Sequence, residues 1–88
     1  MEVRHDSAAH RFSVEVEGHT GTIDYELRDG VMTVTHTRVP EAIGGRGVAA
    51  ELTRTALDTA RANGWKVIPQ CPYTAAYMRR HHEFGDLL

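Results

Sequence analysis

The chain has 88 residues, which is enough for one domain with one modest hydrophobic core and too few for two. Hydrophobic residues make up 41% of the chain and the formal net charge is −2, which excludes a disordered polymer and gives no general attraction to nucleic acid or anionic membranes. The single cysteine, Cys71, excludes an internal disulfide and fits a reducing compartment. The first residues lack the apolar core of a signal peptide, and no apolar run reaches the roughly 20 residues that span a bilayer. We therefore expect one cytoplasmic domain over residues 1–88, as a monomer or weak homodimer.

The first part of the chain predicts consecutive antiparallel strands. Residues 1–10 are polar and are predicted to be a short, frayed lead-in. Apolar and polar residues alternate over 12–17 and again over 22–28, which is typical of half-buried strands, with residues 18–21 as the turn between them. Asp29-Gly30 predicts a tight hairpin turn, because both residue types tolerate positive φ.

The third strand is predicted from Val31 to about Val39 and completes a three-stranded meander. Alternation along this strand places Met32, Val34 and His36 on one face and the intervening threonines on the other, unless a bulge shifts the register. Pro40 ends the strand because proline has no N–H to donate to a neighbouring strand.

The second half predicts two helices with a strand between them. A helical spacing of apolar residues begins at about Gly47 and stops at Asn63-Gly64. The apolar segment 65–69 follows, and a strand–helix–strand succession makes it parallel to the third strand through a right-handed crossover. Pro72 suits the first turn of a helix that runs to about His82. The predicted fold is therefore α/β (α+β) with the order βββαβα.

The segment Gly44-Gly45-Arg46-Gly47 joins a predicted strand to a predicted helix. Unpaired backbone N–H groups and the positive end of the helix dipole meet at such a junction, which suits a phosphate or pyrophosphate. A Walker P-loop is excluded because no Lys-Ser/Thr pair follows Gly47, and a dinucleotide-binding fold is excluded because βαβ units do not precede the turn. Flexible loop glycines are the alternative interpretation.

The residues Gly44-Gly45-Arg46-Gly47-Val48-Ala49 resemble the Arg/Gln-x-x-Gly-x-Gly/Ala signature of the Gcn5-related N-acetyltransferases. Gly47 and Ala49 match the two small positions of that signature. Gly44 stands where Arg or Gln is usual, a departure that removes a side chain but no backbone donor.

Segments 36–41 and 67–77 extend the resemblance to the minimal single-domain subfamily, which lacks the N-terminal helices of full-length members. The similarity covers about residues 12–86. It implies an acetyl-coenzyme A site, with the pyrophosphate at the glycine turn and the pantetheine along the third strand like an added strand. The residues implied in binding are His36, Thr37, Arg38, Val39, Gly44, Gly45, Arg46, Gly47, Val48 and Ala49. For Arg46, a solvated loop arginine is the alternative to a phosphate contact.

The resemblance also implies catalytic candidates. Cys71 precedes a helix N-terminus, which favours the thiolate form of its side chain. Three roles are open for this residue: a nucleophile that carries the acetyl group, a wall of the acyl pocket, or an inert buried thiol. Tyr77 resembles the helical tyrosine that protonates the departing coenzyme A thiolate, against a core aromatic, whereas Tyr73 is assigned to packing. His36 is a candidate base for an amine or for Cys71, against a structural histidine. The third strand lacks the glutamate that many superfamily members use.

Together these residues predict an enzyme that transfers acetyl from acetyl-coenzyme A to an amine, either directly or through acetyl-Cys71. The acceptor is a small molecule or a protein lysine. The alternative is a non-catalytic coenzyme A-binding module with a regulatory or partner-binding role, which the missing strand glutamate and the few residues left for an acceptor pocket favour. The six histidines lack metal-ligand spacing, so no metal is expected.

Overall fold

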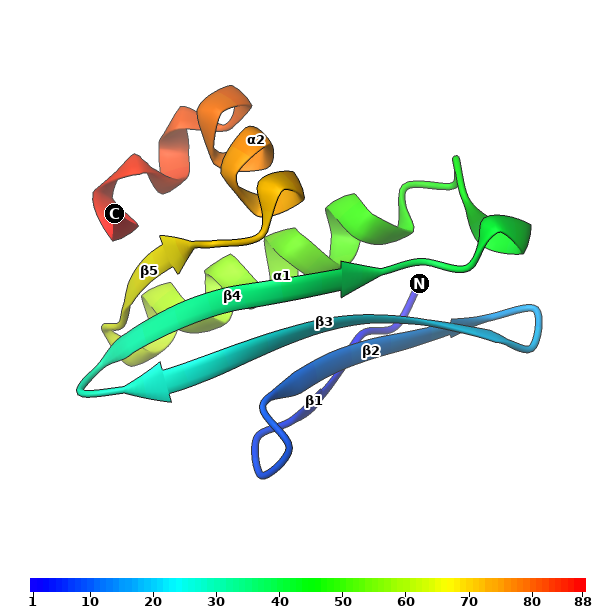
Figure 1. Ribbon diagram of the computed structural model, residues 1–88, viewed down its shortest axis with the longest axis horizontal. Helices are drawn as coiled ribbons and strands as arrows, with labels where there is room; N and C mark the ends of the chain where they lie inside the picture. Colours follow the sequence, from blue (N-terminus) through cyan, green and yellow to red (C-terminus); the bar gives the residue numbers. More distant parts are fainter.

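The computed structural model describes residues 1–88 and contains one five-stranded sheet in the order β1-β2-β3-β4-β5 (Figure 1). Neighbouring strands are antiparallel except β4 and β5, which are parallel. This arrangement confirms the predicted fold class and the parallel crossover. The elements in chain order are β1 (Arg4–Asp6), β2 (Arg11–Val16), β3 (His19–Arg28), β4 (Val31–Arg38), the 3-10 helix η1 (Glu41–Ile43), α1 (Val48–Asn63), β5 (Lys66–Pro69), α2 (Pro72–Arg80) and the 3-10 helix η2 (His82–Leu87).

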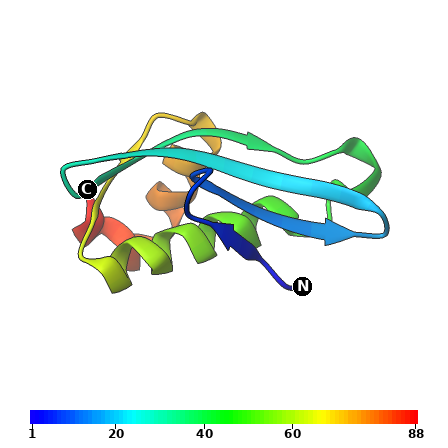
Figure 2. The same ribbon diagram turned by 90° about the horizontal axis from the view of Figure 1, so that it is seen from below.

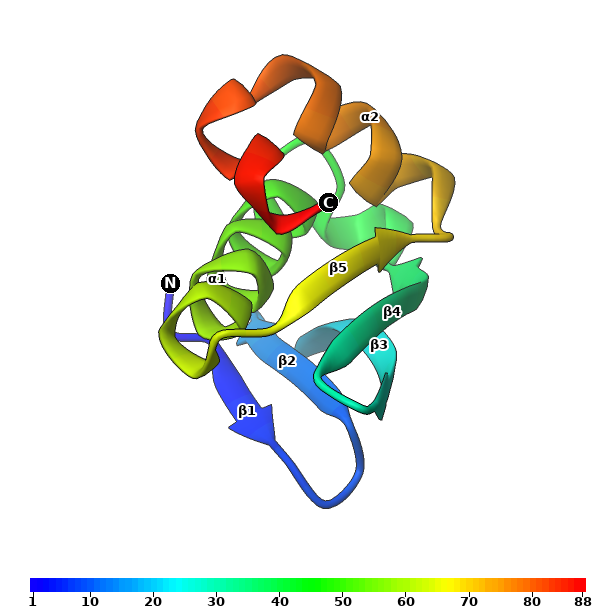
Figure 3. The same ribbon diagram turned by 90° about the vertical axis from the view of Figure 1, so that its left-hand side faces the viewer.

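Both α-helices cover the same face of the sheet, as the view from below shows (Figure 2). Seen from the end, the sheet curves around α1, which lies on its concave side (Figure 3). The core lies between these two layers, and its largest fully buried side chains include Phe12, Ile23, Met32, Leu52 and Leu57. The opposite face of the sheet has no covering helix, and the strands alternate apolar and polar residues as a one-sided sheet requires.

Two of the three hairpin turns have the same two-residue form. Asp29 and Gly30 have φ of 52° and 75°, which confirms the predicted turn between β3 and β4. The turn between β2 and β3 is Glu17-Gly18, with φ of 49° and 79°, and not residues 18–21. Two turn residues are enough here because both adopt positive φ, and the strand therefore resumes at His19.

The strand β1 lies within a segment that the sequence pattern predicts to be frayed. The His5 ring stacks on Phe12 with 4.1 Å between ring centroids, and its Nε2 lies 2.6 Å from the Tyr25 hydroxyl oxygen. Burial lowers the pKa of His5, which favours the neutral ring in this contact. Aromatic packing by residues distant in sequence thus holds a segment whose own residues are polar.

A β-bulge interrupts the pairing of β3 with β4. Asp24 pairs with His36, whereas the next residue, Tyr25, pairs with Val34, so Thr35 is an extra residue on β4. The Thr35 hydroxyl donates to the Asp24 carbonyl oxygen at 3.2 Å, which satisfies one group that the interruption frees.

The bulge exchanges the two faces of β4 beyond Thr35. Thr37 pairs with the buried Ile23 and faces the helices, whereas His36 is exposed on the open face. The prediction that His36 shares a face with Met32 and Val34 is therefore wrong. An extra residue shifts the two-residue period by one, so every side chain after it changes face.

Gly21 allows the N-terminal end of α1 to lie close to β3. A Cβ at this position would lie 2.8 Å from Cγ1 of Val48 and 3.4 Å from Cδ1 of Leu52. We expect Gly21→Ala to push α1 from the sheet and to lower the free energy of unfolding by about 1–3 kcal/mol in urea denaturation. Gly85→Ala is the matched control, because a Cβ there meets nothing within 4 Å. Equal midpoints for the two variants would contradict this account.

Candidate functional site

The glycine turn ends in the N-terminus of α1 and presents a run of free backbone donors. Gly45 and Gly47 have φ of 76° and 78°, the left-handed region that favours glycine. The Gly44 N–H donates to the Glu41 carbonyl oxygen at 3.0 Å, whereas the N–H groups of residues 45–49 have no acceptor and no side chain caps the helix. These five donors lie at the positive end of a 16-residue helix, an arrangement suited to an anion.

A largely apolar hollow of about 290 Å³ adjoins these donors. Tyr73, from the first turn of α2, lines this hollow together with residues of the glycine turn. Its assignment to packing from the sequence did not place Tyr73 at the site. A hollow with apolar walls and backbone donors at one end fits a ligand with an apolar chain and a phosphate. The lining residues are Val39, Ile43, Gly44, Gly45, Gly47, Val48, Ala49, Ala50 and Tyr73.

The Arg46 side chain forms an ion pair with Glu17 of the β2–β3 turn. Both side chains are about half exposed or more, and exposed pairs of this kind stabilise a fold little. A phosphate at the glycine turn can therefore compete with Glu17 for the guanidinium.

β4 has an open edge directly before the glycine turn. β5 pairs with β4 only along Val31–Val34, and the Cys71 N–H then donates to the Val34 carbonyl oxygen at 2.9 Å. Beyond that bond the chain turns into α2, so residues 35–38 have β3 on one side and no strand on the other. The backbone groups of this edge are available to a ligand that lies along it as an added strand.

Cys71 is the N-cap residue of α2, at the point where β5 leaves β4. Its side chain is 6% exposed, and Sγ lies 3.4 Å from the Thr37 hydroxyl oxygen. Burial by itself raises the pKa of this thiol. That effect is outweighed by groups that favour the thiolate, namely the Thr37 hydroxyl, the backbone N–H groups of Thr74 and Tyr73, and the Thr74 hydroxyl. The pKa of Cys71 therefore lies below its usual range, and a lowered pKa is what a nucleophilic cysteine requires.

The other two catalytic candidates do not converge on Cys71 in the same way. Tyr77 is buried, its ring stacks on His81 with 3.9 Å between centroids, and burial raises its pKa so that the hydroxyl keeps its proton. Its ring lies 6.4 Å from that of Tyr73. His36 lies on the open face of the sheet, the reverse of the face that carries Thr37.

The profile of the GCN5-related N-acetyl-transferase family matches residues 11–87, which is nearly the whole chain. The chain belongs to this family. Family membership implies acyl-coenzyme A-dependent acetyl transfer, with acetyl-coenzyme A as co-substrate and a second substrate as acceptor.

Two relatives and one solved structure are similar to most of this chain. Protein NATD1 of Mus musculus is 31% identical over 84 residues, which cover 92% of this chain and 76% of that protein. Protein NATD1 of Xenopus tropicalis is 32% identical, with 92% and 77% covered. The solution structure of a GCN5-like protein from Staphylococcus aureus superposes with a TM-score of 0.76 at 24% identity, covering 98% of this chain and 85% of that one, and shows the same fold.

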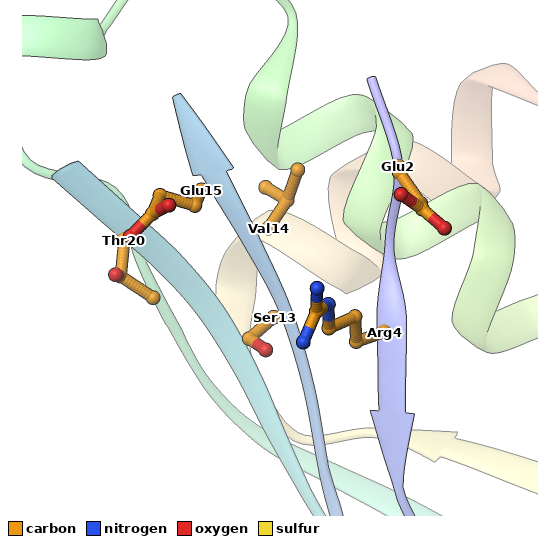
Figure 4. A pocket seen from close by; sticks show the side chains of 6 residues that line it. All are labelled: Glu2, Arg4, Ser13, Val14, Glu15 and Thr20. Atoms are coloured by element: carbon orange, nitrogen blue, oxygen red, sulfur yellow. The ribbon is translucent and has the colours of Figure 1, made fainter. Parts of the chain in front are cut away.

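A second hollow of about 390 Å³ lies where β1 and β2 diverge and is polar (Figure 4). Arg4 extends beside Ser13, and Glu2 lies on the segment that precedes β1. This polar hollow shares no lining residue with the hollow at the glycine turn.

No helix is both long and apolar enough to cross a membrane, and no three His, Cys, Asp or Glu side chains gather in a form suited to a metal ion.

Proposed function

We propose that this protein transfers the acetyl group of acetyl-coenzyme A to an amine, with Cys71 as the covalent carrier. One observation carries the proposal: the open edge of β4 joins the free donors of the glycine turn to the Cys71 thiol. A substrate laid along this edge has its phosphates at the glycine turn and its thioester near Cys71, which is the order of these groups along acetyl-coenzyme A.

In this proposal the chain's backbone does most of the binding. The N–H groups of residues 45–49 donate to the pyrophosphate, and the Arg46 side chain exchanges Glu17 for a phosphate. The edge of His36, Thr37 and Arg38 pairs with the pantetheine amides, and Val39 packs against its apolar part. Gly44 contributes through the shape of the turn, because its own N–H is already bonded to Glu41.

The proposed chemistry proceeds in two displacements at Cys71. The Cys71 thiolate attacks the thioester carbonyl carbon, a new C–S bond forms, and the bond to the coenzyme A sulfur breaks. A tyrosine hydroxyl protonates the departing thiolate and regains its proton from solvent. The acceptor amine then attacks acetyl-Cys71, loses a proton to a base and leaves the amide product, so that the Cys71 thiolate is restored.

The His36 side chain faces away from Cys71, so in this proposal the acceptor amine loses its proton to solvent and not to His36. We expect His36→Gln to leave both the acetylation of Cys71 and the transfer to the amine within about twofold of the unmodified rates, since general-base catalysis would supply a far larger effect. Rapid-quench intact mass spectrometry measures the two steps separately. A variant that slows only the transfer step, by about a hundredfold, would show that His36 is the base.

Tyr77 is the proposed acid, and Tyr73 is its competitor because it lines the hollow. We expect the phenylalanine variant of the tyrosine that protonates coenzyme A to have a kcat about a hundredfold below that of the unmodified protein. The kcat of the other phenylalanine variant is expected to change little. The assay is coenzyme A release from Tyr77→Phe and Tyr73→Phe at saturating acetyl-coenzyme A. Equal rates in both variants and in the unmodified protein would exclude a tyrosine acid.

The proposal as a whole is tested by incubating the protein with acetyl-coenzyme A and a panel of amines, polyamines and lysine peptides. Coenzyme A release that depends on an amine, with one acetyl adduct on the protein in its absence, supports the enzyme. Tight coenzyme A binding without adduct or release with any amine would overturn it in favour of the non-catalytic binding module.

A further inference from the structure

Thr74 carries the only buried side-chain polar atom in the structure without a hydrogen-bond partner. It is 0% exposed and its hydroxyl oxygen makes no hydrogen bond in the structure, although it lies near enough to Cys71 to be among the groups that lower the pKa of that thiol. Burying an unsatisfied hydroxyl costs free energy, so such a group requires an explanation. Thr53, equally buried on α1, shows the usual solution, because its hydroxyl donates to the Ala49 carbonyl oxygen at 2.8 Å.

The position of Thr74 in α2 identifies the partner it lacks. Cys71 is the N-cap residue, so Thr74 is the third residue of the helix, the position from which the Glu or Gln of a capping box reaches back to the N-cap backbone N–H. That N–H already donates to the Val34 carbonyl oxygen. The Cys71 carbonyl oxygen accepts from the Ala75 N–H at 3.0 Å. This leaves Sγ of Cys71, which accepts hydrogen bonds weakly as a thiol and strongly as a thiolate.

Thr37 approaches the same sulfur from the sheet, with 3.4 Å between its hydroxyl oxygen and Sγ. It does so only because the bulge at Thr35 turns it toward the helices. The Thr37 hydroxyl from β4 thus lies beside the sulfur, and the Thr74 hydroxyl belongs to the first turn of the helix that Cys71 caps and acts on the same thiol.

We propose that Thr74 and Thr37 form a thiolate-binding pair, in which Thr74 is a positioning residue whose hydroxyl finds its acceptor when Cys71 ionises. The inference rests on the proposed function and deepens it, because it assigns the activation of the nucleophile to two hydroxyls and the α2 N-terminus rather than to a histidine base. The proton of the thiol leaves to solvent, and the hydroxyls keep their own protons. When Cys71 becomes acetylated the acceptor is lost, so the same pair favours release of the cysteine as a leaving group.

The test is a titration of Cys71 in the free protein by ultraviolet absorbance of the thiolate, corrected with Cys71→Ser, and by the pH dependence of iodoacetamide labelling. We expect Thr74→Val to raise the midpoint by about one pH unit and to slow labelling at neutral pH by about tenfold, because the thiolate is the reacting form. Thr74→Ser keeps the hydroxyl and is expected to titrate as the unmodified protein does. Thr37→Val is expected to raise the midpoint in the same direction.

Thr53→Val is the matched control, since it removes a buried helical hydroxyl distant from the thiol in the chain, and it is expected to leave the midpoint unchanged. A Thr74→Val midpoint equal to that of Thr53→Val, or a Ser variant that shifts as far as the Val variant, would overturn the proposal. If Thr74→Val does not fold, the Ser variant and Thr37→Val decide it alone. Because no coenzyme A is present, a shifted midpoint without acetyl transfer in the unmodified protein would refute the proposed function and leave this inference standing.

Discussion

Cys71→Ala is expected to lose the acetyl adduct completely and to lower kcat/KM for amine acetylation by at least about a hundredfold. Cys71 is the only cysteine in the chain, so no other thiol can replace it as carrier. Intact mass spectrometry after exposure to acetyl-coenzyme A detects the adduct. The rate of coenzyme A release in the presence of the best amine measures turnover.

The affinity of the variant for coenzyme A shows whether the substitution disturbs the whole binding site. The dissociation constant of Cys71→Ala is expected to stay within about twofold of the unmodified value, because the pyrophosphate and pantetheine contacts come from other residues. Cys71→Ser provides a second control of nearly equal size. Turnover retained in both variants would show direct transfer to the amine, with Cys71 as a wall of the acyl pocket.

Gly47→Asn is expected to weaken coenzyme A binding by at least about tenfold, because it places a side chain among the five free N–H groups of the glycine turn. Asparagine tolerates the left-handed conformation that Gly47 adopts, with φ of 78°, so the helix is expected to start normally. Isothermal titration calorimetry with coenzyme A measures the effect.

Gly64→Asn is the matched control for backbone strain. Gly64 ends α1 with φ of 71°, and as at Gly47 nothing lies within 4 Å of a Cβ added there. The two variants are expected to lose similar stability in urea, while only Gly47→Asn loses affinity. Equal affinity in both variants would place the pyrophosphate elsewhere.

The parts of the fold that sequence reasoning predicted well depend on local chemistry. Asp29-Gly30 marks a turn because its two residues accept positive φ, and Asn63-Gly64 ends α1 for the same reason. The glycine segment before Val48 is recognised because a strand and a helix flank it. In each case a few neighbouring residues carry the whole signal.

The candidate site was predicted less completely, because its side chains depend on register and packing. Thr37 faces Cys71 and His36 faces away because of one bulge, and Tyr73 rather than Tyr77 lines the hollow. The unpaired hydroxyl of Thr74 has no signal in the sequence, since its burial depends on how α2 packs against the rest of the chain.

By itself, the sequence determined the order of β2 to β5 and the two α-helices, the two-residue turn at Asp29-Gly30, the glycine junction between β4 and α1 and the presence of a thiol at the start of α2, but it missed β1. Only the tertiary structure decided which side chains meet that thiol. A two-residue period in the sequence shows that side chains alternate between the faces of the sheet, but not which face a given residue takes. The extra residue Thr35 exchanges the two faces, because β3 pairs with the residues on either side of it. That pairing is a contact between distant residues, and it is the physical reason why Thr37 and not His36 reaches Cys71.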